Sequence, residues 1–244
     1  PAGSTSMEVI LASDTTTATI MASFAPSALA GIEFNAFSHS SSTGTSASST
    51  HDSGAEADRF LIIGVMWQSN ESIAGAAVTY DGVASTKIGE QSQTGGARRI
   101  ALYYIEDPSS GSNTATATRG SSTGSMFIFV TSLSGADVFD VGGTEDPHTP
   151  ALTTTADNDW MFGITRNGAG QTVTAGTGTI RRSSTGGGDL AFGDSNGSVG
   201  SAGAHNLTWD VASSSAFISV TGSVKPVAVV TAVVRNLMTL GVGR

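Results

Sequence analysis

The residues of this chain that could take part in catalysis or ligand binding are its histidines, its serines and a run of glycines. The four histidines are scattered without metal-ligand spacing, which indicates loop or surface residues: His39, His51, His148 and His205. Serines are abundant, but no Gly-x-Ser-x-Gly elbow with a triad order can be assembled. The glycine run at residues 186–188 lacks the Lys-Ser/Thr pair of a phosphate-binding loop. The sequence therefore predicts no catalytic and no cofactor-binding residue.

Acidic side chains gather in three turn-like segments, at Asp52, Glu56 and Asp58, at Glu145 and Asp146, and at Asp157 and Asp159. Calcium takes about six to eight oxygen ligands, often from such loops. None of the three segments matches a defined calcium-loop pattern, and Asp is a common turn former. Paired carboxylates of a glycoside hydrolase stay an open alternative, because their separation is not encoded in spacing. We predict no metal ligand and a non-enzymatic protein.

Tryptophan side chains could form a platform that stacks on sugars. Trp67 and Trp160 lie within or beside strongly apolar runs, and Trp209 lies in a shorter one. Large aromatic side chains in such runs usually pack in the core. We therefore expect core packing in preference to a sugar platform.

Composition excludes several classes of function. Lys and Arg total 11 against a net charge of −9, and they form no basic stripe, so direct binding of nucleic acid is not expected. No apolar run reaches the length of roughly 18 residues that spans a membrane. The amino end carries no secretion signal, which predicts synthesis in a cytoplasm without export by the general route. No cysteine is present, so no disulfide framework exists.

Short apolar, β-branched and aromatic runs separated by Gly, Ser, Asp and Pro recur along the chain, which is typical of an all-β fold. We predict one antiparallel β-sandwich, jelly-roll-like, over residues 32–226, with an N-terminal arm (1–31) and a C-terminal arm (227–244). The serine-rich segment 38–53 is expected to be a long loop. Much of the core is assigned to ten residues: Phe60, Ile62, Val65, Ile100, Leu102, Phe127, Phe129, Phe162, Phe217 and Ile218.

Both arms are too apolar to be expected free in water. The residues predicted to bind a partner are Val9, Leu11, Val229, Val233 and Leu237. Such a segment can add a strand to an exposed sheet edge of another chain. We therefore expect a homo-oligomer, a contact with a major capsid protein, or both.

A series of motifs extends over residues 55–226. It comprises the buried run 62–67, the hairpin 78–84, the strand and turn 101–111, the corner 132–137, Thr208-Trp209 and the closing run 222–226. This series resembles a module widespread in bacteriophage and environmental bacterial proteins, in which Gly-Gly replaces Asp81-Gly82. The resemblance implies a jelly-roll-like β-sandwich of virion or surface proteins and no catalytic residue.

The function expected from this resemblance is that of a virion structural protein, a capsid decoration or cement protein of a tailed bacteriophage. Alternatives are a phage tail or fibre component and a bacterial surface module that binds a receptor or carbohydrate. An exposed aromatic platform would favour binding of a carbohydrate, and clustered carboxylates in a cleft would favour an enzyme. The expected location is the virion, with the cell surface as the alternative.

Overall fold

The computed structural model describes residues 31–69, 71–93, 98–120, 124–145, 151–185, 188–212 and 216–228. Within these ranges all strand pairs are antiparallel and no residue is α-helical; η1 (Gly75–Ala77) is a short 3-10 turn. The strands belong to one compact unit, Ala30–Val227. The prediction of an all-β antiparallel sandwich is confirmed.

The first half of this unit, residues 33–134, contains two sheets. Sheet A has the order β1 (Glu33–Ser42), β9 (Met126–Ser134), β3 (Phe60–Gln68), β7 (Arg98–Glu106), β6 (Thr86–Ser92). Sheet B has the order β2 (Ser46–Asp52), β8 (Ser112–Thr118), β4 (Val78–Tyr80), β5 (Val83–Ala84). The chain alternates between the two sheets in the order that defines a jelly roll.

The second half, residues 136–226, repeats this topology. Sheet C has the order β10 (Ala136–Glu145), β18 (Phe217–Pro226), β12 (Trp160–Asn167), β15 (Leu190–Asp194), β14 (Ile180–Thr185). Two small pairs stand where sheet B stands in the first half, β11 (Ala151–Thr154) with β16 (Gly203–Asn206) and β13 (Val173–Ala175) with β17 (Trp209–Val211). The unit is therefore a tandem of two jelly rolls.

Sheets A and C also share one register. The central strands β3 and β12 pair with their two neighbours at corresponding positions. One residue of the edge strand, β6 in sheet A and β14 in sheet C, bulges out of the ladder at the same place. The positions that correspond between the halves include Ile62/Phe162, Tyr104/Asp194, Thr131/Gly222 and Ile88/Arg182. The correspondence covers pairing and irregularities as well as strand order.

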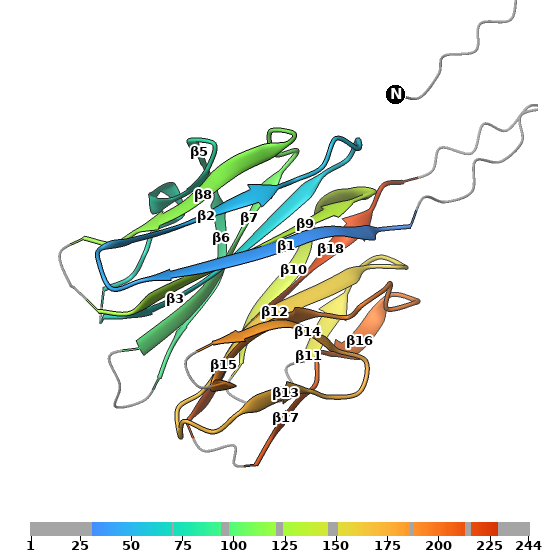
Figure 1. Ribbon diagram of the computed structural model, residues 1–244. Helices are drawn as coiled ribbons and strands as arrows, with labels where there is room; N and C mark the ends of the chain where they lie inside the picture. Colours follow the sequence, from blue (N-terminus) through green and yellow to red (C-terminus); the bar gives the residue numbers. More distant parts are fainter. Residues whose placement is uncertain are drawn as a thin grey trace, which may run out of the picture. The chain divides into compact units, whose positions relative to one another are not determined.

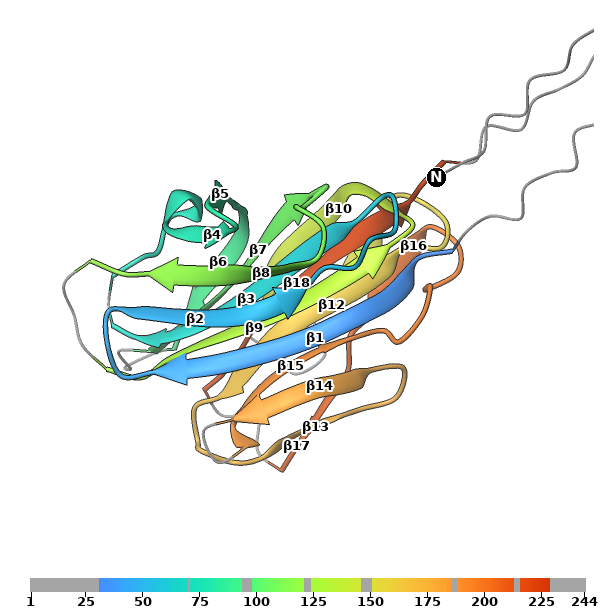
Figure 2. The same ribbon diagram turned by 45° about the horizontal axis from the view of Figure 1, so that its top comes forward.

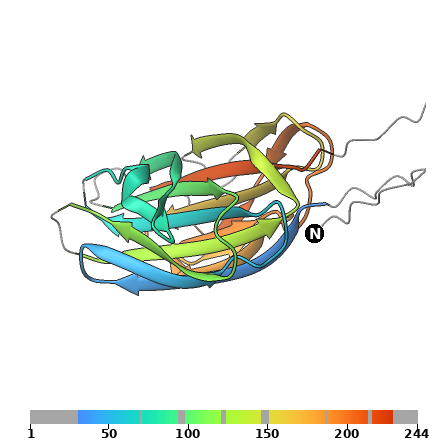
Figure 3. The same ribbon diagram turned by 90° about the horizontal axis from the view of Figure 1, so that it is seen from above.

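Three hydrophobic cores separate four layers. Sheets A and C enclose the largest core, sheets A and B enclose the second, and sheet C and the two small pairs enclose the third. Figure 1 shows this stack from β2 and β8, through β1 and β3, to β12 and then β13 and β17. Seen from above, the strands of successive layers run in roughly the same direction (Figure 3), as expected for aligned sheet packing.

Burial on both faces explains the continuous apolar runs of the central strands. In β3, Ile62 faces sheet C and Ile63 faces sheet B, and both side chains are fully buried. In β12, Phe162 faces sheet A and Met161 faces the small strand pairs. Alternation between polar and apolar residues is therefore absent from these strands, because neither face meets solvent.

The interface between sheets A and C is closely interlocked at Gly64. The Phe129 ring of sheet A stacks on the Phe192 ring of sheet C, with the ring centroids 5.8 Å apart. A Cβ atom added at Gly64 would lie 2.8 Å from Cδ2 of Phe192 and 3.3 Å from Cδ1 of Ile164. Such distances require these core side chains to move, so a residue without a side chain is needed at this position.

The predicted core is confirmed with one difference. Nine of the ten residues assigned to it from the sequence are buried, whereas Phe127 is half-buried and lies against the central core. All three tryptophans are buried, with Trp67 and Trp209 fully so, and the expectation of core packing is confirmed.

The predicted loop at residues 38–53 is wrong. This segment forms the second half of β1 and all of β2, joined by a turn. Its small side chains alternate in β2, where Ala47, Ser49 and His51 are buried and the residues between them are not. Serine is a weak strand former, so neighbouring strands and not propensity determine this segment.

Replacing Gly64 by Ala tests the interlock between the halves. The added methyl group overpacks the central core, and we expect a loss of about 1 to 3 kcal/mol in the free energy of unfolding, measured by chemical denaturation. Gly44→Ala is the control, because its methyl group would meet only the Ser42 hydroxyl, at 3.5 Å. Equal stability of the two variants would show that the halves are not in close contact at Gly64.

Candidate functional site

The residues predicted to bind a partner lie outside the described residues: Val9, Leu11, Val229, Val233 and Leu237. The described structure does show where the two arms join the body. We therefore consider the junction as the first candidate site.

Both arms join the body at one corner. Glu33, near the first described residue, pairs with Ser134 at the end of β9. The Val227 N–H donates to the Gly135 carbonyl at 3.0 Å, directly after β18. Figure 2 shows the start of β1 and the end of β18 at the same end of the layered unit. We call this corner the arm-bearing end.

Two buried carboxyl groups lie close to the arm-bearing end. Asp159 is fully buried just before β12, and Asp140 lies on β10. The Ser223 hydroxyl lies 3.4 Å from Asp159 Oδ2 and 3.5 Å from Asp140 Oδ2. Lys225 Nζ lies 2.9 Å from Asp140 Oδ1, and the Thr155 N–H donates to Asp140 Oδ2 at 2.7 Å. The side-chain oxygen Oδ1 of Asp159 has no hydrogen-bond partner.

The pKa values of the two carboxyl groups are shifted in opposite directions. Burial, and then the hydrogen bond and negative charge of Asp140, raise the pKa of Asp159 to about 7. Burial alone would raise the pKa of Asp140 too, but the hydrogen bonds from Asp159, Thr155 and Lys225 outweigh it and hold that pKa below its usual range. Of the two, Asp159 is therefore the group that binds a proton near neutral pH, while Asp140 stays ionised.

In the sequence, Asp159 lies in an acidic turn segment for which no role is predicted. The signal that could have found the pair is the position of Asp159 immediately before a buried strand. Asp140 could not be connected to it from the sequence, because β10 and β12 become neighbours only through β18.

Asp159→Asn is expected to change how stability depends on pH. The folded-state pKa of Asp159 is above its ordinary value of 3.8, so its stabilising contribution is complete below pH 3.8 and is lost as pH rises through about 7. An Asn amide donates to Asp140 at every pH, so the variant should be more stable than the parent at pH 8, by at least about 1 kcal/mol. Thermal melts from pH 5 to 8 test this.

The matched control for this measurement is Asp81→Asn. Asp81 is exposed in the turn between β4 and β5, where its positive φ of 52° also suits Asn. Its melts should follow those of the parent. A parent-like pH slope in Asp159→Asn would contradict the raised pKa of Asp159.

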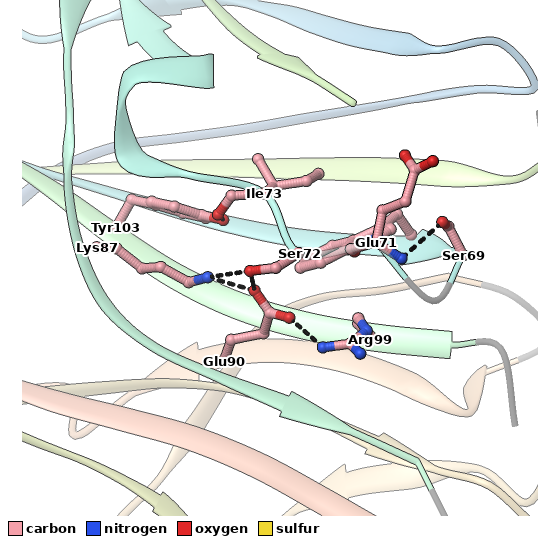
Figure 4. Close-up of polar contacts among 9 residues, drawn as sticks. Ser69, Glu71, Ser72, Ile73, Lys87, Glu90, Arg99 and Tyr103 are labelled. Carbon is pink, nitrogen blue, oxygen red and sulfur yellow. Dashed lines mark hydrogen bonds and ion pairs between the residues drawn. The ribbon is translucent and has the colours of Figure 1, made fainter. Parts of the chain in front are cut away.

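A second polar cluster surrounds Glu90 on β6 (Figure 4). Ser72 donates from Oγ to Glu90 Oε2 at 2.7 Å, and Lys87 Nζ contacts the same oxygen. Lys87 Nζ also donates to Ser72 Oγ at 3.0 Å, while Arg99 pairs with Glu90 Oε1. One carboxylate thus holds two cations and one loop hydroxyl.

Two further bonds attach the same loop, which follows β3, to sheet A. Trp67 Nε1 donates to the Glu71 carbonyl at 2.7 Å, and the Tyr103 hydroxyl donates to the Ile73 carbonyl at 2.8 Å. Both donors belong to buried aromatic side chains of the core between sheets A and B. The Glu90 cluster is therefore a structural clamp that closes this core.

Glu90→Gln should weaken the clamp. Burial raises the pKa of Glu90, but hydrogen bonds from Lys87, Ser72 and Arg99 outweigh it and lower the pKa, so the stabilisation is lost as pH falls through that lowered value. Lys87 and Arg99 are about a quarter exposed (25% and 26%), so we expect a loss of only about 1 to 2 kcal/mol at pH 7.

Chemical denaturation at pH 7, with Glu33→Gln as an exposed control, measures this loss. Hydrogen exchange should accelerate in the loop after β3. Parent-like stability and exchange in Glu90→Gln would show that the carboxylate does not hold the loop.

The histidines divide between surface and interior. His39 is exposed on β1, His205 is half-buried on β16, and His148 lies outside the described residues. The expectation for His51 is wrong, because it is only 2% exposed between β2 and sheet A. Its Nδ1 lies 3.0 Å from Ser38 Oγ and its Nε2 3.0 Å from Ser132 Oγ.

Burial controls the titration of this histidine. It lowers the pKa of His51 to about 4, against the raising effect of Asp52. His51 is therefore neutral at pH 7. The two serine hydroxyls satisfy both ring nitrogens, as a buried imidazole requires.

Among the described residues, no three His, Cys, Asp or Glu side chains are grouped so that they could hold a metal ion. The same part of the chain contains no helix long and apolar enough to span a membrane. Comparisons with protein-family models, curated proteins and solved structures found no match to this chain.

Proposed function

We propose that the chain is a non-enzymatic structural protein of a virion, acting as a decoration or cement protein on the capsid of a tailed bacteriophage. It stabilises the shell through contacts of its arms with further copies of itself or with the major capsid protein. The two jelly rolls form the rigid body, and the arms attach this body to the shell.

The observation that carries this proposal is the junction of both apolar arms at one corner of the body. Residues 229–234 read Val-Val-Thr-Ala-Val-Val, and the last described residues before them are fixed beside Gly135. Burying each large apolar side chain of an arm stabilises an assembly by about 1.5 to 3 kcal/mol. Two arms leaving one corner can therefore act together on one partner surface.

The body itself offers little apolar surface to a partner. Among the described residues, the exposed large hydrophobic side chains are Val83 and Val138. An aromatic platform, which would favour the carbohydrate-binding alternative, is not formed by these residues, since each described Trp, Tyr and Phe is buried or half-buried. Both observations favour assembly through the arms over ligand capture on the faces.

Deletion of residues 1–30 or 229–244 tests the proposal. Each truncated protein should stay folded, with a melting temperature close to that of the full chain, because the described core is retained. Each should lose self-association in sedimentation and should be missing from particles purified from the strain that carries the gene. The full chain should be present in those particles.

Val83→Ser is the matched control, because it removes one of the two exposed apolar side chains outside the arms. It should enter particles like the parent. If both truncations still assemble normally, or if the full chain is absent from every particle, the virion proposal is wrong.

A further inference from the structure

A cavity of about 130 Å³ lies between the two jelly rolls, at the end of the central core opposite the arm-bearing end. It is lined by residues of both halves: Met66, Gln68, Arg98, Ser125 and Phe127 from the first, Arg166 and Asp189 from the second. The cavity is therefore complete only where sheets A and C meet.

Arg166 is an unexpected residue in this position. Its side chain is 1% exposed, and its corresponding position in the first half is Met66, which lines the same cavity. The position of Met66 shows that an apolar side chain can occupy this end of the central core. A buried cation needs compensation by a partner, whereas Met does not, so packing alone does not explain the arginine.

The charges around the cavity do not balance. Arg166 Nη2 lies 2.8 Å from Asp189 Oδ2, and its Nη1 donates to Gln93 Oε1. Arg98 Nη1 lies 3.9 Å from the same Oδ2 atom, beyond hydrogen-bond distance. Two guanidinium groups therefore share one carboxylate, which leaves one positive charge in excess.

We propose that this cavity binds a small oxyanion, of the carboxylate or phosphate type, between the guanidinium groups of Arg98 and Arg166. Guanidinium groups match the geometry of both anions and form strong charge-assisted hydrogen bonds with them. Arg98 provides access, because its side chain is 42% exposed, while Arg166 provides a fixed charge inside the core.

The size of the cavity limits the ligand. A volume of about 130 Å³ corresponds to roughly four waters at their share of the liquid volume. Inorganic phosphate, acetate or the carboxylate end of a larger molecule fits this space. Met66 and Phe127 form the apolar part of the lining, which leaves Arg98 and Arg166 as its cationic groups.

The test titrates the full chain separately with inorganic phosphate, acetate and glucuronate, at constant ionic strength set with chloride. Arginine side-chain NMR signals and calorimetry report binding. The signals of Arg98 and Arg166 should shift saturably with at least one of the three probes. The probe that saturates distinguishes a phosphate from a simple carboxylate and from a sugar acid.

Arg98→Gln should weaken binding by about tenfold or more and should remain folded, because this side chain lies at the surface. The double variant Arg166→Met with Asp189→Asn replaces the buried pair without leaving a lone charge and should also bind weakly. Arg181→Gln is the control, since Arg181 donates to the Val173 carbonyl and does not line the cavity.

Absence of saturable shifts with all three probes would overturn the proposal and identify a hydrated cavity. Unchanged affinity in Arg98→Gln, or an equal loss in Arg181→Gln, would overturn it as well. Assembly into particles is a separate measurement, so either proposal can fail without the other.

Discussion

Sheets A and C bury both of their faces, and the contact between them determines most of what this chain can be. Phe129 and Phe192 stack across the interface where Gly64 allows the two sheets to approach. Each sheet must in addition be covered on its other face, by sheet B on one side and by the small strand pairs on the other. Four layers follow from the need to cover two sheets that are apolar on both sides.

The two halves share topology and register but differ in chemistry at corresponding positions. On one side of the central core, Phe139 stacks on Tyr104 with ring centroids 4.8 Å apart. At the corresponding place on the other side, the Arg182 guanidinium lies 3.7 Å from the centroid of the Phe34 ring and pairs with Asp194. A stacked aromatic pair on one side thus corresponds to a cation on an aromatic ring on the other.

A second pair of corresponding positions in the central core also differs in chemistry between the two halves. Met66 in the first half corresponds to Arg166 in the second, which pairs with Asp189. The ion pairs at this interface therefore rely on groups of the second half. Such pairs contribute less to stability than apolar packing of similar volume, but they fix which residues can face each other.

Much of the fold could be predicted from the sequence, and the reasons for the failures are physical. The central strands carry apolar runs that only burial on both faces explains, so the class, the core and the tryptophans were predicted correctly. The strands of the serine-rich segment could not be predicted, because their stability comes from pairing with β8 and β9. The looser second half was not predicted to be a jelly roll of its own, since corresponding residues of β3 and β12 differ at every position.

The candidate sites were less accessible to sequence reasoning than the fold. Asp140, Asp159 and Lys225 lie on or beside different strands of sheet C. They meet because β18 pairs with both β10 and β12, and its Ser223 is 64 residues from Asp159 in the sequence. His51 is paired with Ser132, which is 81 residues away. Polar groups of this kind resemble ordinary turn or surface residues until the sheets are assembled.

The location of the polar groups restricts how the body can associate. The middle of the central core is apolar, and the Arg166 pair lies at its end opposite the arm-bearing end, whereas Asp140 and Asp159 meet at Ser223 on the other face of sheet C, beside the third core. The outer face of sheet B presents hydroxyl groups such as those of Ser48 and Thr116, which bond to each other at 3.1 Å. Hydroxyl groups already paired on a solvated sheet give little free energy to a protein contact. The described outer face of sheet B therefore offers little free energy for strong association.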